Sequence, residues 1–237
     1  MIQLLESIQF DVAGIQEATS AMIKDLHAGL KEFSWIGVGR NDGKQGGEYT
    51  PIFYRTERFR LLDSGTFWLA ADCHRPAKGW DAHCYRIVTW GHFEDLHNGR
   101  RYFVFNTHFD HMGRRARTES AKLILGRLKE LGSNPVVLTG DLNCSESSAA
   151  YRILTGTPPL SPGTNDHLRD TLYQSKSPPQ GPAKTYRGWL SMLGIRRIDY
   201  IFASRGFNTI HHTTIDDHPP VSDHRAVLAE LEYSGGK

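Results

Sequence analysis

The chain has 237 residues and a formal net charge of +2, from 28 basic and 26 acidic side chains. Its hydrophobic fraction of 39% and charged fraction of 23% are ordinary for a folded protein and exclude a disordered or fibrous chain. The net charge is far smaller than that of a dedicated DNA-binding module. Twelve histidines, several beside carboxylates, point to metal binding or acid–base chemistry.

Hydrophobic periodicity and turn residues predict mixed helices and strands in the first half of the chain. An amphipathic helix is expected at 1–8, a short strand at 11–17 and a second helix at 18–33. Besides hairpin-forming residues at 59–68, the strands expected next are 35–38, 48–54, 86–93 and 101–106. An Asn98-Gly99 step before the last of these is a strong hairpin signal.

In the second half, a helix is expected at 114–131, followed by a buried strand that starts at Pro135 and ends near Gly140. A short helix is expected near 146–154, and strands at 198–202, 209–215 and 226–233. The Pro/Gly-rich connections at 155–165 and 175–182 are too short to be domain linkers. The sequence therefore predicts a single domain over 1–237.

The three cysteines, Cys73, Cys84 and Cys144, form no zinc-binding spacing. Three reduced thiols are favoured over a Cys73–Cys84 disulfide. No apolar run approaches the ~20 residues that span a bilayer. We expect a monomer, cytoplasmic as the sequence stands and secreted or periplasmic should a signal peptide precede Met1.

Acidic, amide and imidazole side chains recur where the expected strands end. They are Glu17, Glu48, His108, Asp141, Asn143, Asp199, Asp223 and His224. Each has an ordinary structural explanation, such as an Asx turn at Asp141 and Asn143. Residues i and i+2 of an extended chain face the same side, so these two could also point at one spot. Because α/β folds hold ligands at strand ends, the shared placement favours a functional site.

These side chains suit metal-assisted hydrolysis of a phosphate ester. Mg²⁺ (or Mn²⁺) prefers oxygen ligands and keeps several waters, so one or two carboxylates can hold it. Glu17 and Asp223 are the expected pair. His224, oriented by Asp199, is the expected general base toward water.

The remaining polar residues are expected to position the substrate. Asp141 and Asn143 would orient the nucleophile and the phosphate. His108 would donate a hydrogen bond to a non-bridging phosphate oxygen, with Glu48 holding its tautomer. In each case the alternative is a hydrogen-bonded structural residue.

Five short motifs stand in the order found in the endonuclease/exonuclease/phosphatase superfamily of DNase I-like hydrolases, which the whole chain resembles. They are Gln16-Glu17, Asn106-Thr107-His108, Gly140-Asp141-Leu142-Asn143, Arg197-Ile198-Asp199-Tyr200 and Ser222-Asp223-His224. The runs 46–55 and 107–111 resemble a bacterial branch of small metal-dependent hydrolases. The resemblance implies an α/β four-layer sandwich, in which two packed mixed β-sheets are flanked by helices.

By motif position, the resemblance implies that Glu17 is the principal metal ligand, with Asp223 beside it or in its hydrogen-bonded shell. Members of the family begin with a strand that ends in an Asn-containing motif, and no asparagine precedes Asn41 here. We therefore expect a domain truncated at its N-terminus. Such a chain expressed alone is expected to be poorly soluble or weakly active.

The natural substrate is left open between nucleic acid and a small phosphorylated metabolite or lipid. Arg187 and Trp189 lie where related enzymes carry substrate-contacting residues, and Arg114 begins a basic helical turn that could clamp phosphate. A near-neutral charge argues mildly against long nucleic acid. The competing hypothesis is a non-catalytic binding protein of the same fold.

Overall fold

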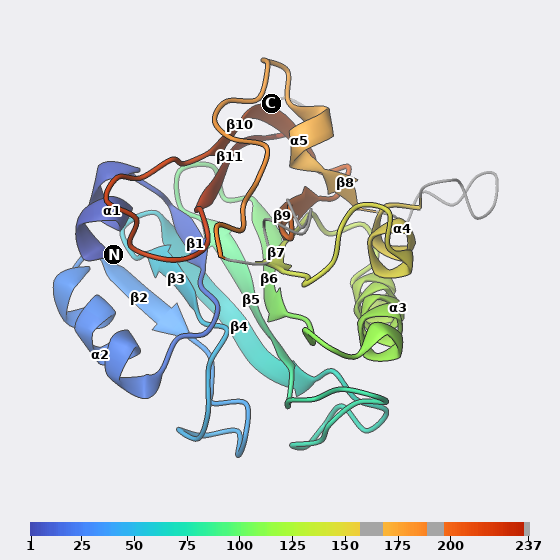
Figure 1. The fold of residues 1–237 in the computed structure, drawn as a ribbon. Helices are drawn as coiled ribbons and strands as arrows, with labels where there is room; N and C mark the ends of the chain where they lie inside the picture. Colours follow the sequence, from blue (N-terminus) through green and yellow to red (C-terminus); the bar gives the residue numbers. More distant parts are fainter. Residues whose placement is uncertain (157–167, 189–196, 235–237) are drawn as a thin grey trace. The chain divides into compact units, whose positions relative to one another are not determined.

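The computed structural model describes residues 1–156, 168–188 and 197–234, and divides into two compact units, Met1–Ala116 and Arg117–Lys237. The chain colours in Figure 1 run from blue at the N-terminus to red at the C-terminus. Both units contain helices and strands, which confirms the expected α/β class. The expectation of a single domain over the whole chain stays a prediction.

The first unit contains two short helices and two groups of antiparallel strands. Its elements are α1 (Ile2–Ser7), β1 (Val12–Gly14), α2 (Ser20–Gly29), β2 (Phe33–Ile36), β3 (Ile52–Arg55), β4 (Phe59–Trp68), β5 (Ile87–Asp95) and β6 (Arg101–His108). Strands β1 and β2 both pair with β3. Strand β5 pairs with β4 on one side and with β6 on the other.

The core of this unit forms where α1 and α2 lie against the strands β1 to β3, as the blue helices in Figure 1 show. Ile23 and Leu26 of α2 are buried in one cluster with Phe33 and Phe53 of the strands. Burying each such side chain contributes roughly 1.5–3 kcal/mol. Thr19 begins α2 by accepting a hydrogen bond from the Met22 N–H at 3.3 Å.

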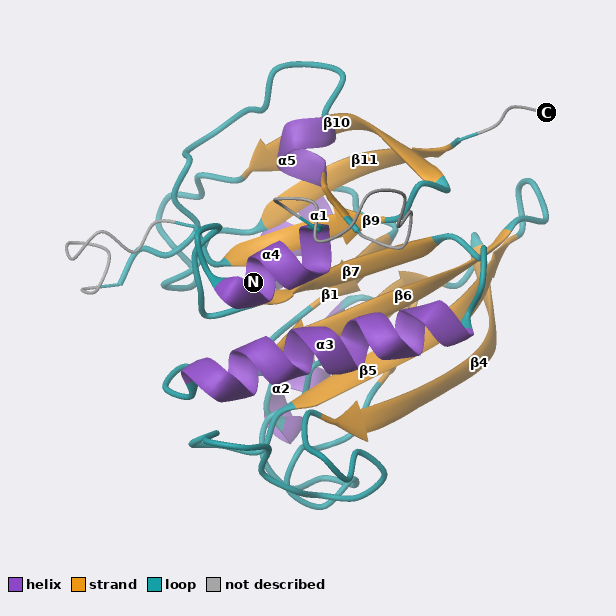
Figure 2. Ribbon diagram, turned by 90° about the vertical axis from the view of Figure 1, so that its right-hand side faces the viewer, coloured by secondary structure: helices purple, strands orange, loops and turns teal. Residues whose placement is uncertain are grey.

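The second unit is built around the strand β9. Helix α3 (Arg114–Glu130) begins in the first unit and leads into β7 (Val136–Asp141), α4 (Ala149–Thr155), β8 (Arg169–Asp170), α5 (Thr171–Gln174), β9 (Asp199–Ala203), β10 (Phe207–Thr214) and β11 (Val227–Tyr233). Strand β9 pairs antiparallel with β7 and with β8. Strands β10 and β11 form a separate antiparallel pair, visible in Figure 2 with α5 beside it.

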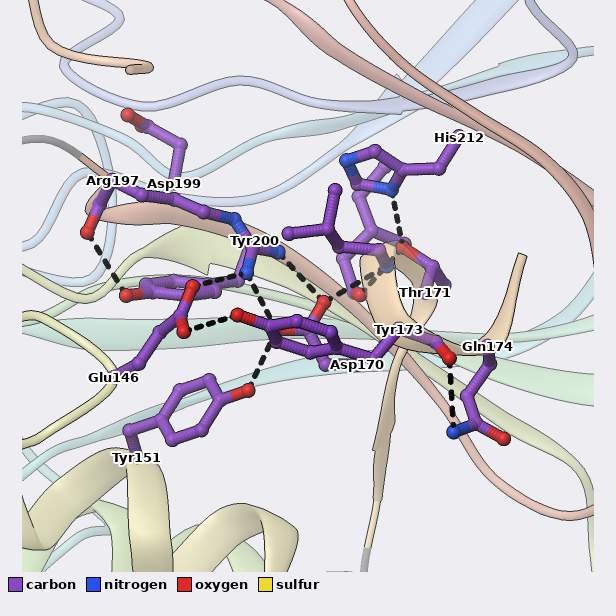
Figure 3. A network of polar contacts seen from close by, with 12 residues as sticks. Glu146, Tyr151, Asp170, Thr171, Tyr173, Gln174, Arg197, Asp199, Tyr200 and His212 are labelled. Carbon is purple, nitrogen blue, oxygen red and sulfur yellow. Dashed lines mark hydrogen bonds and ion pairs between the residues drawn. The ribbon is translucent and has the colours of Figure 1, made fainter. Parts of the chain in front are cut away.

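A buried ion-pair network holds the chain just before β9 (Figure 3). The Arg197 guanidinium donates two hydrogen bonds to Asp170, at 2.6 and 2.7 Å, and one to Glu146 at 2.9 Å. Tyr151 donates to the same Asp170 carboxylate at 2.8 Å, and the guanidinium lies 4.5 Å from the Tyr200 ring centroid. Burial alone lowers the pKa of Arg197, but the bonds to Asp170 raise it, so the guanidinium stays charged.

The structure departs from the expected elements at a few places. The strand expected from Glu48 begins only at Ile52, because residues 39–48 form a loop closed by its own backbone hydrogen bonds. The short elements β8 and α5 carry no periodic signal and were missed. Cys73, Cys84 and Cys144 are free thiols, as favoured. Within the described ranges, no helix is long and apolar enough to cross a membrane.

Candidate active site

Three of the expected site residues come together in the first unit. A ligand atom from each of Glu17, Glu48 and His108 lies within 4.8 Å of the other two, and we call this the glutamate–histidine cluster. Glu17 follows β1 with an exposed side chain and a φ of +58°, a conformation that non-glycine residues seldom adopt. Glu48 pairs with Arg40 at 2.5 Å. That Glu48 also holds the tautomer of His108 stays a prediction.

Buried Asn106 explains why two of the sequence motifs occur together. Its side chain donates to the carbonyls of Ile15 at 2.8 Å and of Pro51 at 2.9 Å, and it accepts from Gln16 at 2.7 Å. The Gln16-Glu17 turn and the Asn106-Thr107-His108 strand end are therefore fixed to each other within the first unit. Sequence reasoning used the motif order but had no means of identifying this asparagine as the link.

A second cluster lies in the second unit and contains Asp141, Asp199 and His224, the aspartate–histidine cluster. Asp141 and Asp199 are opposite each other where β7 pairs with β9. His224 Nδ1 lies 3.0 Å and 2.9 Å from the two Asp199 carboxylate oxygens. Burial alone lowers the pKa of His224, but the hydrogen bond to Asp199 and the charges of Asp199, Asp141 and Asp223 raise it to about 9.

The turn at Asp141 and Asn143 has the geometry of an Asx turn. Asp141, only 5% exposed, accepts a hydrogen bond from the Asn143 N–H at 2.7 Å. Asn143 has a φ of +47°, so the chain is no longer extended there. Of the two possibilities left open by the sequence, the structure has the Asx turn, because the strand ends at Asp141.

The remaining predicted residues are placed as follows. Asp223 is exposed in the second unit, whereas Glu17 belongs to the first, and their sharing of a metal stays a prediction. Arg114 is exposed at the start of α3. The Arg187 guanidinium is 13% exposed and pairs with Asp217 at 2.6 Å. Trp189 lies outside the described residues, so its substrate contact is untested.

A third cluster of metal-ligand types was not expected from the sequence and consists of Cys84, Asp110 and His111. Asp110 accepts four backbone N–H bonds, which outweigh its burial and lower its pKa. Arg86 places a nitrogen 3.2 Å from His111 Nδ1 and another 3.7 Å from Asp110. A guanidinium this close to Asp110 and His111 disfavours a second cation at this cluster.

Comparison with known proteins shows the relationship of the whole chain. Residues 1–224 match the endonuclease/exonuclease/phosphatase family. A family member from Bacteroides vulgatus is 36% identical, with a TM-score of 0.90, and the match covers 98% of this chain and 88% of that one. The Bacteroides thetaiotaomicron mannosyl-6-phosphatase Bt3783 is 33% identical, with a TM-score of 0.87 and coverages of 98% and 89%. A search of curated proteins found no match.

More distant structures share the fold alone. Danio rerio TDP2, solved with a single-strand DNA product, is 17% identical with a TM-score of 0.73, and the match covers 97% of this chain and 89% of that one. These likenesses confirm the DNase I-like fold, and the family match confirms the resemblance seen in the motif series. This chain belongs to the endonuclease/exonuclease/phosphatase family.

Proposed function

We propose that the chain is a divalent-metal-dependent phosphoesterase that uses His224 to activate water. The observation that carries the proposal is the imidazole–carboxylate pair of His224 and Asp199. Family membership over residues 1–224 supports the hydrolase class. Both clusters are proposed to serve one reaction, because their motifs occur in the family's order.

The donor chemistry of the glutamate–histidine cluster fits a hard divalent cation. Glu17 and Glu48 offer carboxylate oxygens, the ligand type that Mg²⁺ and Mn²⁺ prefer. Glu17, with Asp223 as the second carboxylate, is the proposed ligand set, and Arg40 holds Glu48 by an ion pair. Such a cation would supply polarisation of a phosphoryl oxygen.

The protein groups supply the proton transfer. Asp199 accepts from Nδ1–H of His224, which leaves Nε2 as the nitrogen that takes a proton from water. The negative charges around His224 favour its protonated form, so the fraction of free base reaches one half only near pH 9 in the metal-free protein. The proposed roles of Asp141 and Asn143 are to orient the nucleophile and the phosphate, and that of His108 is to donate to a phosphate oxygen.

The proposed substrate class is a small phosphomonoester. A relative that is 33% identical and covers 98% of this chain is a mannosyl-6-phosphatase, whereas the DNA-bound relative is only 17% identical. The net charge of +2 also gives little attraction for a long polyanion. Arg114 and Arg187 are kept as proposed phosphate contacts, and Trp189 as a proposed contact of the organic group.

The direct test is a substrate panel of mannose 6-phosphate, p-nitrophenyl phosphate, bis(p-nitrophenyl) phosphate and single-stranded DNA, each with Mg²⁺, Mn²⁺ or EDTA. Turnover of the monoesters should exceed that of DNA and should stop in EDTA. His224→Ala should lower kcat by about 100-fold or more. His211→Ala is the matched control, because this histidine is 54% exposed in the same unit. Full turnover in EDTA would contradict the metal mechanism.

A double-mutant cycle tests whether the two clusters serve one reaction. Glu17→Gln and His224→Ala should each lower kcat strongly. Residues that act in one chemical step give non-additive effects, so the double variant should lose much less than the product of the two losses. Strictly multiplicative losses would place the clusters in separate processes. No phosphoesterase activity in any condition would favour the alternative of a non-catalytic binding protein.

A further inference from the structure

The segment Thr185–Arg187 contacts both halves of the His224–Asp199 pair. These two residues come from parts of the second unit that are 25 positions apart in the sequence. This three-residue stretch forms hydrogen bonds with the backbone at both residues, from the Thr185 side chain at Asp199 and from its own backbone at His224. We call this stretch the bridging segment.

Thr185 fixes the chain at Asp199. Its hydroxyl oxygen accepts hydrogen bonds from the N–H groups of Ile198, at 3.1 Å, and of Asp199, at 3.2 Å. Thr185 is 1% exposed, so this acceptor is almost fully shielded from solvent. On the other side of the strand, Asp199 pairs with Asp141 of β7. The main chain that carries the carboxylate is therefore held from two directions.

The same segment fixes the chain around His224. Tyr186 forms an antiparallel bridge with His224, and the centroids of their rings are 5.1 Å apart in an edge-on arrangement. The backbone of Arg225 donates to the Thr185 carbonyl at 2.7 Å, and that of Arg187 donates to the Asp223 carbonyl at 2.7 Å. Two backbone hydrogen bonds therefore hold the residues that directly precede and follow His224.

Arg187 completes this arrangement from its side chain. Its guanidinium donates to the carbonyls of Ser222 at 3.1 Å and of His224 at 3.2 Å, and to the Asp217 carboxylate at 2.6 Å. The Asp217 side chain is only 8% exposed. A guanidinium with these partners has little freedom, so its first role is to fix the loop that carries His224.

We infer that Thr185 is a positioning residue that sets the hydrogen bond between Asp199 and His224, with Arg187 fixing the histidine side of that bond. The inference rests on the proposed function, in which this pair carries out the proton transfer. Neither residue touches the reacting atoms in this role. Removing the hydroxyl of Thr185 takes this acceptor from one buried N–H group and one partly buried N–H group and lets the start of β9 shift.

The test compares Thr185→Val, which keeps the shape but removes the acceptor, with Thr185→Ser, which keeps the acceptor. With p-nitrophenyl phosphate and Mg²⁺, Thr185→Val should lower kcat roughly tenfold or more and leave KM within about twofold, because a misplaced group slows the chemical step. Thr185→Ser should stay within about twofold of the wild type. Thr209→Val, also a buried threonine of the second unit, should leave kcat unchanged.

Two further readouts separate positioning from a merely structural role. In an Asp199→Asn background, Thr185→Val should cause no further loss of kcat, because its effect acts through Asp199. In the metal-free protein, the low-field Nδ1–H proton of His224, identified by its loss in His224→Gln, should shift or vanish in Thr185→Val and stay unchanged in Thr185→Ser and Thr209→Val. Arg187→Lys should change the same proton signal, and it replaces Thr185→Val in this measurement alone should that variant fail to fold, because Arg187 is also a proposed phosphate contact.

The outcomes are distinct for the inference and for the proposed function. Unchanged kcat and an unchanged Nδ1–H signal in both Thr185→Val and Arg187→Lys would overturn the inference while leaving the phosphoesterase intact. Additive losses in the Asp199→Asn background would also overturn it. If the wild type hydrolyses no phosphate ester, the proposed function fails, and the proton signal alone then decides whether Thr185 sets the hydrogen bond.

Discussion

The hydrogen bond between His224 and Asp199 makes a quantitative prediction about the variant Asp199→Asn. Burial alone lowers the pKa of His224, but the hydrogen bond to Asp199 and the charges of Asp199, Asp141 and Asp223 raise it from 6.5 to about 9. One pKa unit corresponds to about 1.4 kcal/mol, so the protonated form gains roughly 3 kcal/mol on folding. The side chains are 26% and 13% exposed, and the charges of Asp141 and Asp223 remain in the variant. We therefore expect the substitution to remove about 2 kcal/mol of this stabilisation.

The sign of the pH dependence follows from the direction of the shift. Because folding raises the pKa of His224, its contribution is fully present below the unfolded value of 6.5 and is lost as the pH rises through about 9. The free energy of unfolding of the wild type minus that of Asp199→Asn should be about 2 kcal/mol larger at pH 6 than at pH 10. Any pH-independent cost of the asparagine cancels in this comparison.

Urea unfolding at pH 6 and pH 10, in EDTA, measures this difference. An NMR titration of the His224 ring proton, assigned with His224→Gln, should give a pKa near 9 in the wild type and about 1.5 units lower in the variant. Asp25→Asn, an exposed aspartate on α2, serves as the control and should show no such pH dependence. A stability difference that is equal at the two pH values, together with a wild-type pKa near 6.5, would refute the electrostatic reasoning.

Three further predictions concern the second unit, each measured by urea or thermal unfolding. Arg197→Met leaves the buried Asp170 carboxylate without its counter-charge and should cost about 3–5 kcal/mol, and a cost below about 1 kcal/mol would contradict the network. Gly181→Ala should be among the most destabilising single changes, because its φ is +82° and a Cβ there would lie 1.8 Å from the Thr214 carbonyl oxygen. Burial lowers the pKa of His212 to about 4. Its contribution to stability is therefore present above pH 6.5 and is lost as the pH falls toward 4. His212→Gln should abolish this loss of stability between pH 6.5 and pH 4.

The features that the sequence alone predicts are those with a local cause. Period-two and period-3.6 patterns located most strands and helices, since an amphipathic element records its buried face in its own residues. The pairing of Asp199 with His224 was also predicted, and the structure brings the two side chains within 3.0 Å. A polar residue that directly follows a strand lies at the edge of the sheet wherever that strand ends, so its position can be predicted from the strand alone.

What the sequence does not reveal depends on partners distant along the chain. Thr185 has no pattern that marks it, because its role comes from two N–H groups more than ten residues away. Asn106 was quoted only as part of a motif, although its three hydrogen bonds tie two motifs together. Arg187 was interpreted as a substrate contact from its position, and only the folded chain shows the carbonyls around it.

The turn at Gly140-Asp141-Leu142-Asn143 shows why an ordinary structural explanation does not compete with a functional one. Asp141 uses Oδ1 to accept the Asn143 N–H, which accounts for the turn, and still has a ligand atom within 4.8 Å of Asp199 and His224. A carboxylate has room for about four hydrogen bonds, so closing a turn does not exhaust it. The turn instead fixes the carboxylate beside the imidazole, where its charge contributes to raising the pKa of His224. The local bond that makes Asp141 look structural is thus what would hold it in place for chemistry.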